Sequence, residues 1–287
     1  MNRHLAQLNI ATLRYPIDDP RIADFVDALP LVNGAGEATP GYVWRLQSES
    51  GDATDIRVFD DPLVIVNLTV WESLEALKSF AYRGVHGDFF RRRAEWFVAG
   101  SSRTALWWLP ADVLPTTEDA RRRLDFIDAF GASLYAFETA QLHPALVIER
   151  VSADDGRAQR MITLPNGVAD VVGDSGALVV AEIDGDAAAC GGYRMLDEHT
   201  AEIKHMYVAP SARGLRVGAA IVAELEAVAR NNRIERLLLE TGPRQLPSLA
   251  LYEKFGFRPC PPGAESGSTP LSIRIEKALT TEPSRLA

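Results

Sequence analysis

Cysteine is scarce in this sequence, which has only Cys190 and Cys260 among its 287 residues. Two cysteines so far apart lack the close, repeated spacing of a zinc site or a disulfide framework, and we expect no metal site. No apolar run approaches the length of a membrane span, and none follows the first charges. The sequence therefore predicts a protein of the reducing cytoplasm with no membrane partner.

An excess of positive charge is also lacking. Asp and Glu number 39 against 30 Lys and Arg, so the formal net charge is -9 and the pI is near 5.1. Nucleic-acid binding depends on clustered Lys and Arg, so this balance argues against a nucleic-acid partner. The basic run from Arg91 to Arg93 lies in a helical pattern and is interpreted as a solvated helix face. An acidic protein favours cationic small molecules, such as amines.

Tryptophan is missing from everything after Trp108, although the chain has five of them. A chain of this length also exceeds the size at which one hydrophobic core keeps growing. We therefore expect two domains with separately built cores, over residues 1–141 and 142–287.

The first half reads as alternating strands and helices in an order close to βαββαβ, the split βαβ arrangement. Apolar spacing and turn signals delimit its elements. The predicted strands are 5–13, 42–47, 63–70 and 104–109, and the predicted helices are 18–29, 72–80, 88–97 and 118–130.

The second half is predicted to be an α+β sheet domain. Asp184-Gly185 is a dipeptide that accepts the positive φ angles of a tight hairpin. The predicted strands are 145–151, 178–183, 187–196, 201–208, 237–239 and 271–275, and the predicted helices are 154–162, 217–231 and 248–255.

The passage that indicates chemistry is a strand, a loop and a helix, with the loop at Arg213-Gly-Leu-Arg-Val-Gly218. Glycines at a helix start allow several backbone N–H groups to approach one anion, and the helix dipole adds to the attraction. No Gly-Lys-Ser/Thr follows, and the spacing differs from the dinucleotide pattern G-x-G-x-x-G. The loop therefore indicates a pyrophosphate site of another kind.

Two blocks carry a resemblance to a known family. Arg213 with Gly214 and Gly218 resembles the acetyl-CoA signature Arg/Gln-x-x-Gly-x-Gly/Ala of the GNAT N-acetyltransferase superfamily, with Arg216 where that signature usually has its first glycine. Downstream, Leu251-Tyr-Glu-Lys-Phe-Gly-Phe257 resembles the end of a GNAT domain. The resemblance spans roughly 145–279 and implies a GNAT acyl-CoA N-acyltransferase fold with acetyl-CoA as co-substrate.

The same resemblance implies roles for individual residues. The backbone around Met206, Tyr207 and Val208 would pair with the pantetheine arm as an added strand. Tyr252 would contact the cofactor and protonate the departing thiolate. The pyrophosphate would be held by the N–H groups of Arg213, Gly214, Leu215, Arg216, Val217, Gly218 and Ala219.

The attacking amine also needs a general base, for which the candidates are Glu202, His205 and Glu240. Glu202 ranks first, because the run from Ala201 to Val208 resembles that of one small-molecule-directed GNAT group. A surface ion pair between Glu202 and Lys204 explains the same residues equally well. Strand alternation predicts that Glu202, Lys204 and Met206 share a face opposite His205 and Tyr207, unless a bulge intervenes.

The first half has a resemblance of its own. The stretches 71–82, 91–97 and 105–110 resemble an uncharacterised family of ferredoxin-like domains related in fold to the dimeric α+β barrels. This implies a fold and a homodimer through this domain, not an activity. His86 is either structural or a proton shuttle or metal ligand in a cavity, with Tyr82, Arg83 and Trp108 as further lining residues.

The leading hypothesis is an N-acetyltransferase that moves an acetyl group from acetyl-CoA to a primary amine of a small molecule by direct attack in a ternary complex. A second hypothesis is a non-catalytic sensor of acyl-CoA or a metabolite. A third is a two-headed enzyme with another activity in the N-terminal domain.

Overall fold

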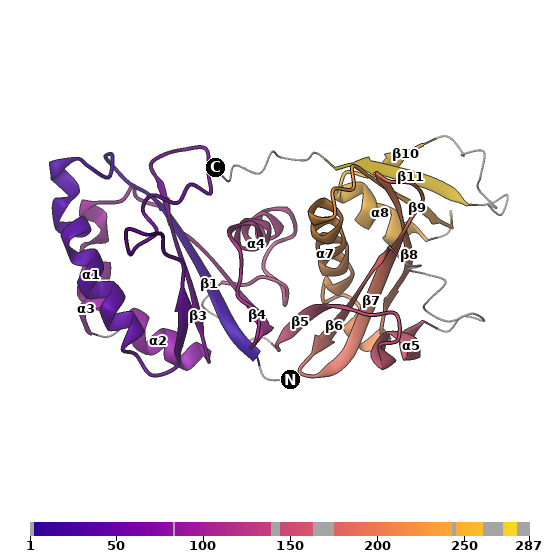
Figure 1. The fold of residues 1–287 in the computed structure, drawn as a ribbon, viewed down its shortest axis with the longest axis horizontal. Coiled ribbons are helices and arrows are strands. Elements are labelled where there is room, and N and C mark those ends of the chain that lie inside the picture. The colour runs from indigo at the N-terminus through magenta and orange to yellow at the C-terminus, as the bar shows by residue number, and fades with distance from the viewer. Residues whose placement is uncertain are drawn as a thin grey trace. The chain divides into compact units, whose positions relative to one another are not determined.

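The computed structural model describes residues 3–82, 84–138, 144–162, 175–242, 245–260 and 272–279. It divides into two compact units, Met1–Val147 and Ile148–Ala287 (Figure 1). The domain boundary expected at 141/142 falls among residues outside the described ones. Each unit is built around its own sheet.

The N-terminal unit has a four-stranded sheet in the order β2-β3-β1-β4, in which every pair is antiparallel. The expected order of strands and helices is confirmed. Its elements are β1 (Arg3–Thr12), α1 (Ala23–Glu37), β2 (Tyr42–Arg45), β3 (Val64–Trp71), α2 (Leu74–Tyr82), α3 (Gly84–Arg92), β4 (Arg103–Pro110) and α4 (Thr117–Phe130), with short 3-10 helices at η1 (Pro20–Ile22) and η2 (Arg93–Glu95).

Helix α3 begins and ends earlier than the predicted 88–97, and helix α1 differs most from its prediction. The pattern predicted a helix that ends at Leu29, since proline removes a backbone donor, yet α1 continues through Pro30 to Glu37. Its start is also later than predicted, because Asp19 caps η1 instead, through a bond from Arg21 N. Burial of Ala28 and Gly36 on one side of α1 holds the helix against the domain and outweighs the missing hydrogen bond.

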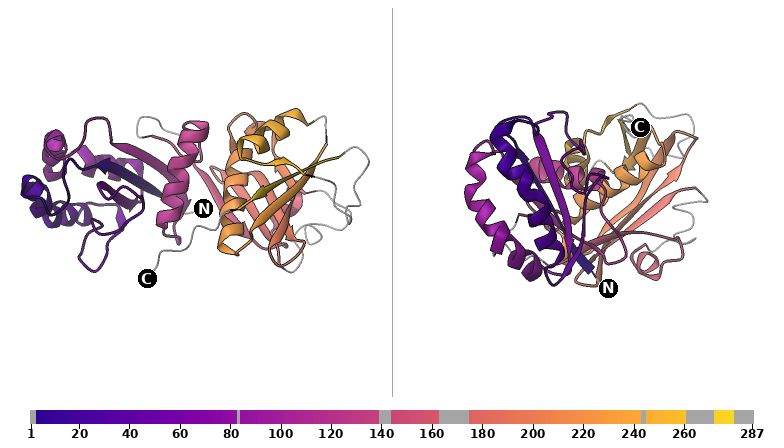
Figure 2. Two further views of the ribbon diagram at one scale, coloured as in Figure 1. Left: turned by 90° about the horizontal axis from the view of Figure 1, so that it is seen from above. Right: turned by 60° about the vertical axis from the view of Figure 1, so that its left-hand side comes forward.

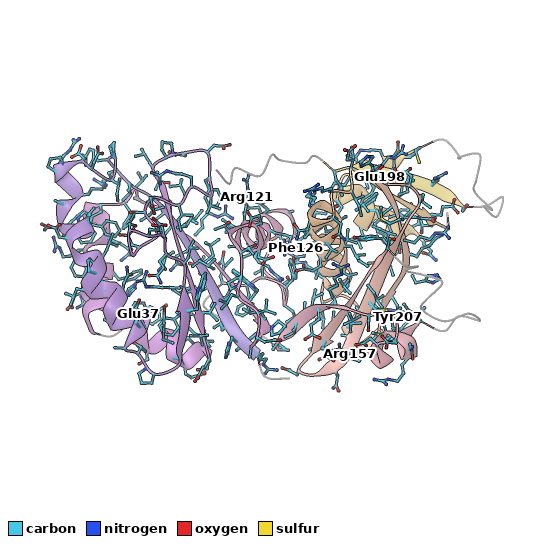
Figure 3. The ribbon with its side chains drawn as sticks, in the orientation of Figure 1. Glu37, Arg121, Phe126, Arg157, Glu198 and Tyr207 are labelled. Carbon is cyan, nitrogen blue, oxygen red and sulfur yellow. The ribbon has the colours of Figure 1, made fainter. Side chains whose placement is uncertain are left out.

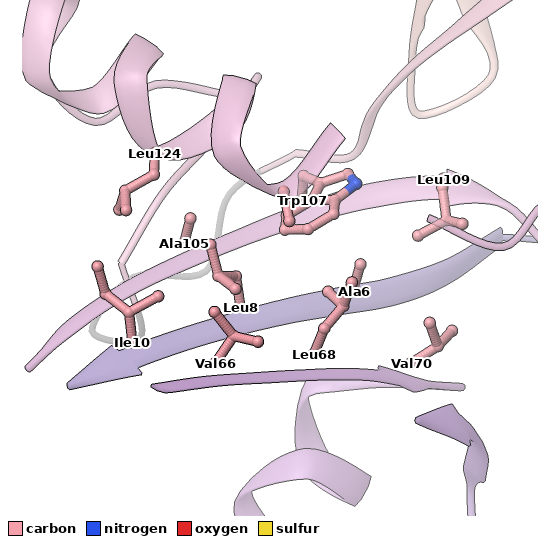
Figure 4. Packing of buried hydrophobic residues seen from close by; sticks show 11 residues of the cluster. Ala6, Leu8, Ile10, Val66, Leu68, Val70, Ala105, Trp107, Leu109 and Leu124 are labelled. Carbon is pink, nitrogen blue, oxygen red and sulfur yellow. The ribbon is translucent and has the colours of Figure 1, made fainter. Parts of the chain in front are cut away.

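The sheet of the N-terminal unit is covered on both faces (Figures 1 and 2). Helices α1, α2 and α3 lie on one face and α4 lies on the other. The α4 face is a dry core, in which Leu124 packs on alternate residues of three strands, including Leu8, Leu68 and Trp107 (Figure 4). A homodimer through this domain stays a prediction, and its interface has to lie elsewhere than on the sheet face that α4 covers.

The C-terminal unit has a seven-stranded sheet in the order β10-β11-β9-β8-β7-β6-β5. Only β8 and β9 run parallel among the pairs whose register is described. Its elements are β5 (Leu146–Val151), α5 (Gly156–Met161), β6 (Ala177–Ile183), β7 (Asp186–Met195), β8 (Thr200–Val208), η3 (Pro210–Ala212), α7 (Val217–Asn231), β9 (Arg236–Thr241), α8 (Leu246–Lys254), β10 (Arg258–Pro259) and β11 (Ile273–Ala278).

Local sequence signals account for the elements around β7 and α7. Asp184 and Gly185 have φ angles of 51° and 95°, so the tight hairpin between β6 and β7 is confirmed. The predicted helix 217–231 is confirmed as α7. Helix α7 packs on one face of β6, β7 and β8, whereas α5 packs with Leu178 and Cys190 on the other. No described helix is long and apolar enough to cross a membrane.

Candidate functional site

The start of α7 presents unbonded backbone donors. The chain leaves β8, turns through η3, and takes left-handed conformations at Gly214 (φ 82°) and Arg216 (φ 62°) before the helix begins. The first helical bond is donated by Ala220 N to Arg216 O at 3.1 Å. Within the described residues, no protein acceptor bonds the amides of Val217, Gly218 or Ala219. Unbonded donors at the positive end of a helix dipole attract anions.

Arg216 occupies a conformation that favours glycine. A left-handed φ costs an L-residue about 1–2 kcal/mol, which explains why the resembling signature has a glycine at this position. The Arg216 side chain is exposed, so no packing in the domain core demands an arginine there. An arginine in place of the usual glycine therefore costs conformational free energy, but the backbone of the loop still takes the left-handed conformation at this position.

Strands β8 and β9 separate next to this loop. They pair in parallel from Thr200 with Arg236 to Ile203 with Leu239, while β8 continues to Val208. Ala209 N donates to Ala188 O of β7 at 2.8 Å, so by alternation the N–H and C=O of Val208 point to the opposite edge. Val208 O there accepts from Arg213 Nε at 3.4 Å. The separated end of β8 thus offers a backbone edge that an extended ligand can pair with.

A bulge in β8 reverses the expected side-chain pattern. Residues His205 and Met206 together oppose Gly191 of β7, and His205 has a φ of 51°. Beyond the bulge, Tyr207 lies opposite Cys190 and packs on the α5 face, with Glu202 and Lys204 (Figure 3). The prediction that Met206 shares the face of Glu202 is therefore wrong, because a bulge interrupts the alternation of side chains along β8.

Gly191 makes room for the Met206 side chain. A Cβ atom at position 191 would lie 2.5 Å from Met206 Sδ and 2.8 Å from Ile221 Cγ2 of α7. Carbon and sulfur do not approach that closely, so a larger residue there displaces Met206 or the helix. The bulge, the glycine and α7 thus form one packed unit beneath the open edge of β8.

Glu202 is buried and engaged on both carboxylate oxygens. Only 7% of the residue is exposed. Arg194 Nε donates to Oε2 at 3.0 Å, and Lys204 Nζ lies 2.7 Å from Oε1. A base must have a free oxygen for the proton it receives. The geometry therefore favours the ion-pair interpretation, which the sequence left open beside the general-base one.

Glu240 stands where the two parallel strands part. It follows Leu239, which makes the last pair with β8, and it lies opposite Arg274 of β11. Its side chain is half-buried, and Ser272 Oγ donates to Oε2 at 3.4 Å. His205, the third candidate, is exposed on the bulge. Of the three candidates, Glu240 combines a place at the separation with an oxygen that no described cation occupies.

Tyr252 lies on α8 with 5% of its surface exposed. Its ring meets Phe257 edge to face, with centroids 5.7 Å apart. Burial raises the pKa of the phenol to about 12, so it keeps its proton at neutral pH. The preceding Leu251 comes within 3.8 Å of the Cβ position of Gly218, which places α8 beside the start of α7.

The backbone segments of the C-terminal unit that the resemblance assigns to the donor lie next to one another. The loop from Arg213, the first turn of α7, the end of β8 and α8 are neighbours in the fold, and Glu240 lies at the adjoining separation. Cys190 lies elsewhere, fully buried against α5, and burial raises the pKa of its thiol to about 12. It is a packing residue in the structure, as its strand position suggested.

Sequence reasoning missed a row of polar residues in the N-terminal unit. Gln7, Asn9 and Asn67 alternate with apolar residues, a pattern that normally indicates the solvent side of a half-buried strand. In the structure they line a cavity beneath helices. His86 and Tyr82 line it as expected, but Trp108 does not, and Arg83 lies outside the described residues.

Across the described ranges, no three His, Cys, Asp or Glu side chains gather closely enough to share an ion.

Comparison with known proteins divides the chain in the same way. Residues 4–152 match the family described as "Domain of unknown function (DUF3291)". Residues 149–257 match the "Acetyltransferase (GNAT) family". The two matches together leave residues 1–3 and 258–287 uncovered.

Individual relatives match the C-terminal half. An IAA acetyltransferase of Azospirillum brasilense is 38% identical over 102 residues, which are 35% of this chain and 67% of that protein. The uncharacterized N-acetyltransferase YsnE of Bacillus subtilis is 40% identical over 98 residues, or 33% and 64% of the two chains. The match thus spans about two thirds of the length of each relative.

Among solved structures, the IAA acetyltransferase of Bacillus cereus superposes with a TM-score of 0.40 and 22% identity, covering 47% of this chain and 100% of the other.

Proposed function

Because the chain belongs to the DUF3291 family through its first half and carries a GNAT acetyltransferase domain in its second, we propose that it transfers an acetyl group from acetyl-CoA to a primary amine of a small molecule. The chain is an acyltransferase, and the donor, the acceptor and the residue roles are the proposal. One observation carries it: unbonded helix donors lie beside an open strand edge, next to the helix that carries a buried phenol.

The proposal assigns the donor to the backbone of two elements. The pyrophosphate binds the N–H groups of the loop and the first turn of α7, from Arg213 to Ala219, in the field of the helix dipole. The pantetheine arm pairs with the free edge of β8 at Met206, Tyr207 and Val208. Val208 C=O exchanges its 3.4 Å contact with Arg213 for a ligand amide, which frees the guanidinium for a phosphate.

The chemical step is direct attack by the amine nitrogen on the thioester carbonyl. The new C–N bond forms as the carbonyl becomes an oxyanion, and the C–S bond then breaks with its electron pair on sulfur. Tyr252 gives its proton to that sulfur. Because burial raises the pKa of Tyr252 to about 12, the phenol still holds its proton at neutral pH when the thiolate forms.

The amine must lose a proton in the same step. We assign this proton to Glu240, directly or through a water it holds, because its carboxylate lies where β8 and β9 part and no described cation neutralises it. Glu202 then acts as a buried carboxylate held by the partly exposed cations Arg194 and Lys204, and this pairing fixes β7 against β8. Removal of one partner from such a network is costly, whereas its presence adds little net stability.

A primary amine is proposed as the acceptor on electrostatic grounds. The protein has a formal net charge of -9, which attracts cationic small molecules from solution. The relatives named for acetyl transfer are consistent with transfer itself and leave the acceptor open.

The test is thiol release from acetyl-CoA across a panel of primary amines, followed with a thiol reagent. Tyr252→Phe is expected to lower kcat about 100-fold, as the loss of a general acid does, while the KM for acetyl-CoA stays within about twofold. Glu240→Gln is expected to lower kcat and to make the remaining rate rise with pH, since hydroxide or a deprotonated amine replaces the base.

The matched control is Tyr193→Phe, which removes a buried phenolic hydroxyl from β7 of the same unit. Tyr193 Oη accepts from Asn232 Nδ2 at 2.7 Å, so this variant is expected to lose about 1 kcal/mol of stability and to keep its kcat. Full activity of Tyr252→Phe assigns the acid to another group. Tight CoA binding without thiol release for any amine refutes the transferase proposal and favours a sensor of acyl-CoA.

A further inference from the structure

The N-terminal unit contains a cavity of about 500 Å³ between its sheet and the helices α1, α2 and α3. This lies within the range of small-molecule sites in proteins. On the opposite face of the same sheet, α4 covers a packed apolar core. The cavity is therefore a feature of one face and not of the packing of the whole domain. Where a helix layer covers a sheet, packed apolar side chains normally fill this space.

The floor of the cavity is polar and crosses three strands. Asn9 of β1 lies opposite Asn67 of β3 on one side and opposite Thr104 of β4 on the other, and Gln7 lies opposite Thr69. Gln7 and Thr69 are buried, with 8% and 5% of their surfaces exposed. Asn67 is exposed although it is in the middle of a strand, so the cavity opens to solvent. Polar groups placed under helices cost free energy unless a partner binds them.

Hydrogen bonds orient one of these amides as a donor. Trp71 Nε1 donates to Thr69 Oγ1 at 2.8 Å, and an indole nitrogen can only donate. The Thr69 hydroxyl therefore directs its own proton to Gln7 Oε1, 3.2 Å away. The Nε2 group of Gln7 remains with two N–H donors for a ligand. The floor is thus built to bind hydrogen-bond acceptors.

The walls of the cavity are aromatic. Side chains from α1, α2, α3 and β3 present rings to it, and Phe80 stacks on Trp71 with centroids 5.3 Å apart. Phe90 stands at the opening with 45% of its surface exposed. Rings in this arrangement favour a flat, apolar ligand body. The aromatic lining residues include Phe25, Trp71, Phe80, Phe89, Phe90 and Trp96.

Charge at the cavity is positive, against the trend of the whole chain. Lys78 and Arg93 line it, and neither has an acidic partner among the described residues. Arg45 also lines it and is paired with Glu37, whose position on α1 is labelled in Figure 3. The acidic lining residue Asp52 accepts from the N and Oγ1 of Thr54 on its Oδ1.

We infer that the N-terminal unit binds a small planar aromatic carboxylate in this cavity, with its ring among the aromatic walls and its carboxylate oxygens accepting from Gln7 and Asn67. The donors of the floor and the cations Lys78 and Arg93 select an anion, and the rings select a flat body. This site is separate from the acetyl-transfer site, and the inference does not depend on the acceptor proposed above.

The experiment is isothermal titration of the full chain with three probes of one shape: 2-naphthoate, 2-naphthamide and 2-naphthylmethylamine. We expect 2-naphthoate to saturate one site per chain. The uncharged amide is expected to bind about tenfold more weakly, since bonds between charged partners are about twice as strong as neutral ones, and the amine more weakly still. Acetyl-CoA saturates the other site in a parallel titration and is expected to leave the affinity for 2-naphthoate unchanged.

Gln7→Glu locates the binding in this cavity. The two side chains have the same shape, so Thr69 can still donate to the new residue, but an acceptor replaces the donor group. Affinity for 2-naphthoate is expected to fall at least about tenfold. Asn67→Asp, at an exposed position, is expected to act in the same direction without affecting folding. The control Gln47→Glu makes the same chemical change at an exposed position outside the cavity and is expected to leave binding unchanged.

Three results overturn the inference: no saturable heat with 2-naphthoate, equal or tighter binding of the amide or the amine, or unchanged affinity in both Gln7→Glu and Asn67→Asp. Melting temperatures of the variants separate a lost site from a lost fold.

Discussion

The two units of this protein create an opening in different ways. In the C-terminal unit the opening lies within the sheet, where β8 and β9 part after Ile203 and Leu239. In the N-terminal unit the sheet is continuous, and the opening lies between it and its helices. A parted sheet presents backbone groups, which are the same for every residue type, whereas a gap above a sheet presents side chains. Backbone conformation therefore governs the first site, and residue identity governs the second.

The largest expected effect concerns the two faces of the N-terminal sheet. Trp107→Ala opens a hole in the dry core against α4 and is expected to lower the free energy of unfolding by about 3–5 kcal/mol. Asn67→Leu, on the cavity face, adds apolar surface where nothing is packed and is expected to change it by no more than about 0.5 kcal/mol.

Urea titration followed by tryptophan fluorescence measures both variants. All five tryptophans are in the N-terminal unit, so this signal reports on that unit alone. Equal destabilisation by the two substitutions contradicts the distinction between a filled face and an open one.

The second prediction separates binding from stability at the C-terminal site. Gly218→Asp places a carboxylate among the free donors of α7, where the positive end of the helix dipole attracts it. This substitution is expected to raise the free energy of unfolding by about 0.3–1 kcal/mol. The same charge repels a pyrophosphate, so the Kd for acetyl-CoA is expected to rise about 10-fold to 100-fold.

Gly218→Ala is the control for that change. Its Cβ would meet Val208 Cγ2 at 3.4 Å, an ordinary contact, so we expect nearly unchanged affinity. If Gly218→Asp and Gly218→Ala bind acetyl-CoA with equal affinity, the pyrophosphate does not bind at the start of α7.

The third prediction concerns the conformational cost at Arg216. Arg216→Gly relieves the left-handed φ of 62° but adds the entropy of a glycine in the unfolded chain, so a net gain of about 0.5–1 kcal/mol is expected. Arg213→Gly, at a φ of -67° in the same loop, gains no such relief and is expected to destabilise. Tryptophan fluorescence does not report on the C-terminal unit. The unfolding transition of that unit is therefore followed by circular dichroism in both variants. If Arg213→Gly is more stable than Arg216→Gly, the left-handed conformation of Arg216 is not a source of strain.

The smallest expected effect is a pH dependence at the cavity. Burial lowers the pKa of His86 and outweighs the opposing hydrogen bond between its Nδ1 and Ala81 O at 2.8 Å, so the folded unit favours the neutral ring. Because the folded-state pKa is below the unfolded value, this stabilisation is present above about pH 6.5 and is lost as the pH falls through the folded pKa. His86→Phe keeps the stacking on Phe80 and is expected to reduce the loss of stability between pH 7 and pH 5.

Tryptophan fluorescence measures this change as well. His199→Gln, at an exposed position in the other unit, is expected to leave the pH dependence of the tryptophan transition as it is in the unaltered chain.

The sequence predicted what is encoded locally. Helix α7, the hairpin at Asp184-Gly185 and the strand order of the first half follow from short-range spacing and turn chemistry. The acetyltransferase site was recognisable for the same reason, since its loop and α8 are each a continuous stretch of residues.

What the sequence did not predict depends on pairing between distant segments. The bulge at His205 exists because two residues oppose Gly191 on another strand, and no local pattern specifies that register. The polar floor joins Asn9 with Asn67 and Thr104 across three strands, and its alternation in each strand looks like an ordinary solvent face. Only the helices above it make those residues an interior surface.

The contact between Gly191 and Met206 restricts how these two positions can change in evolution. A Cβ at 191 would lie 2.5 Å from the Met206 sulfur, so neither position can change size freely while the other stays the same. Across descendants of this gene, a glycine at 191 should be inherited together with a long side chain at 206, and a larger residue at 191 should appear only beside a shorter one. Such paired changes would record the history of the strand edge on which donor binding is proposed to depend.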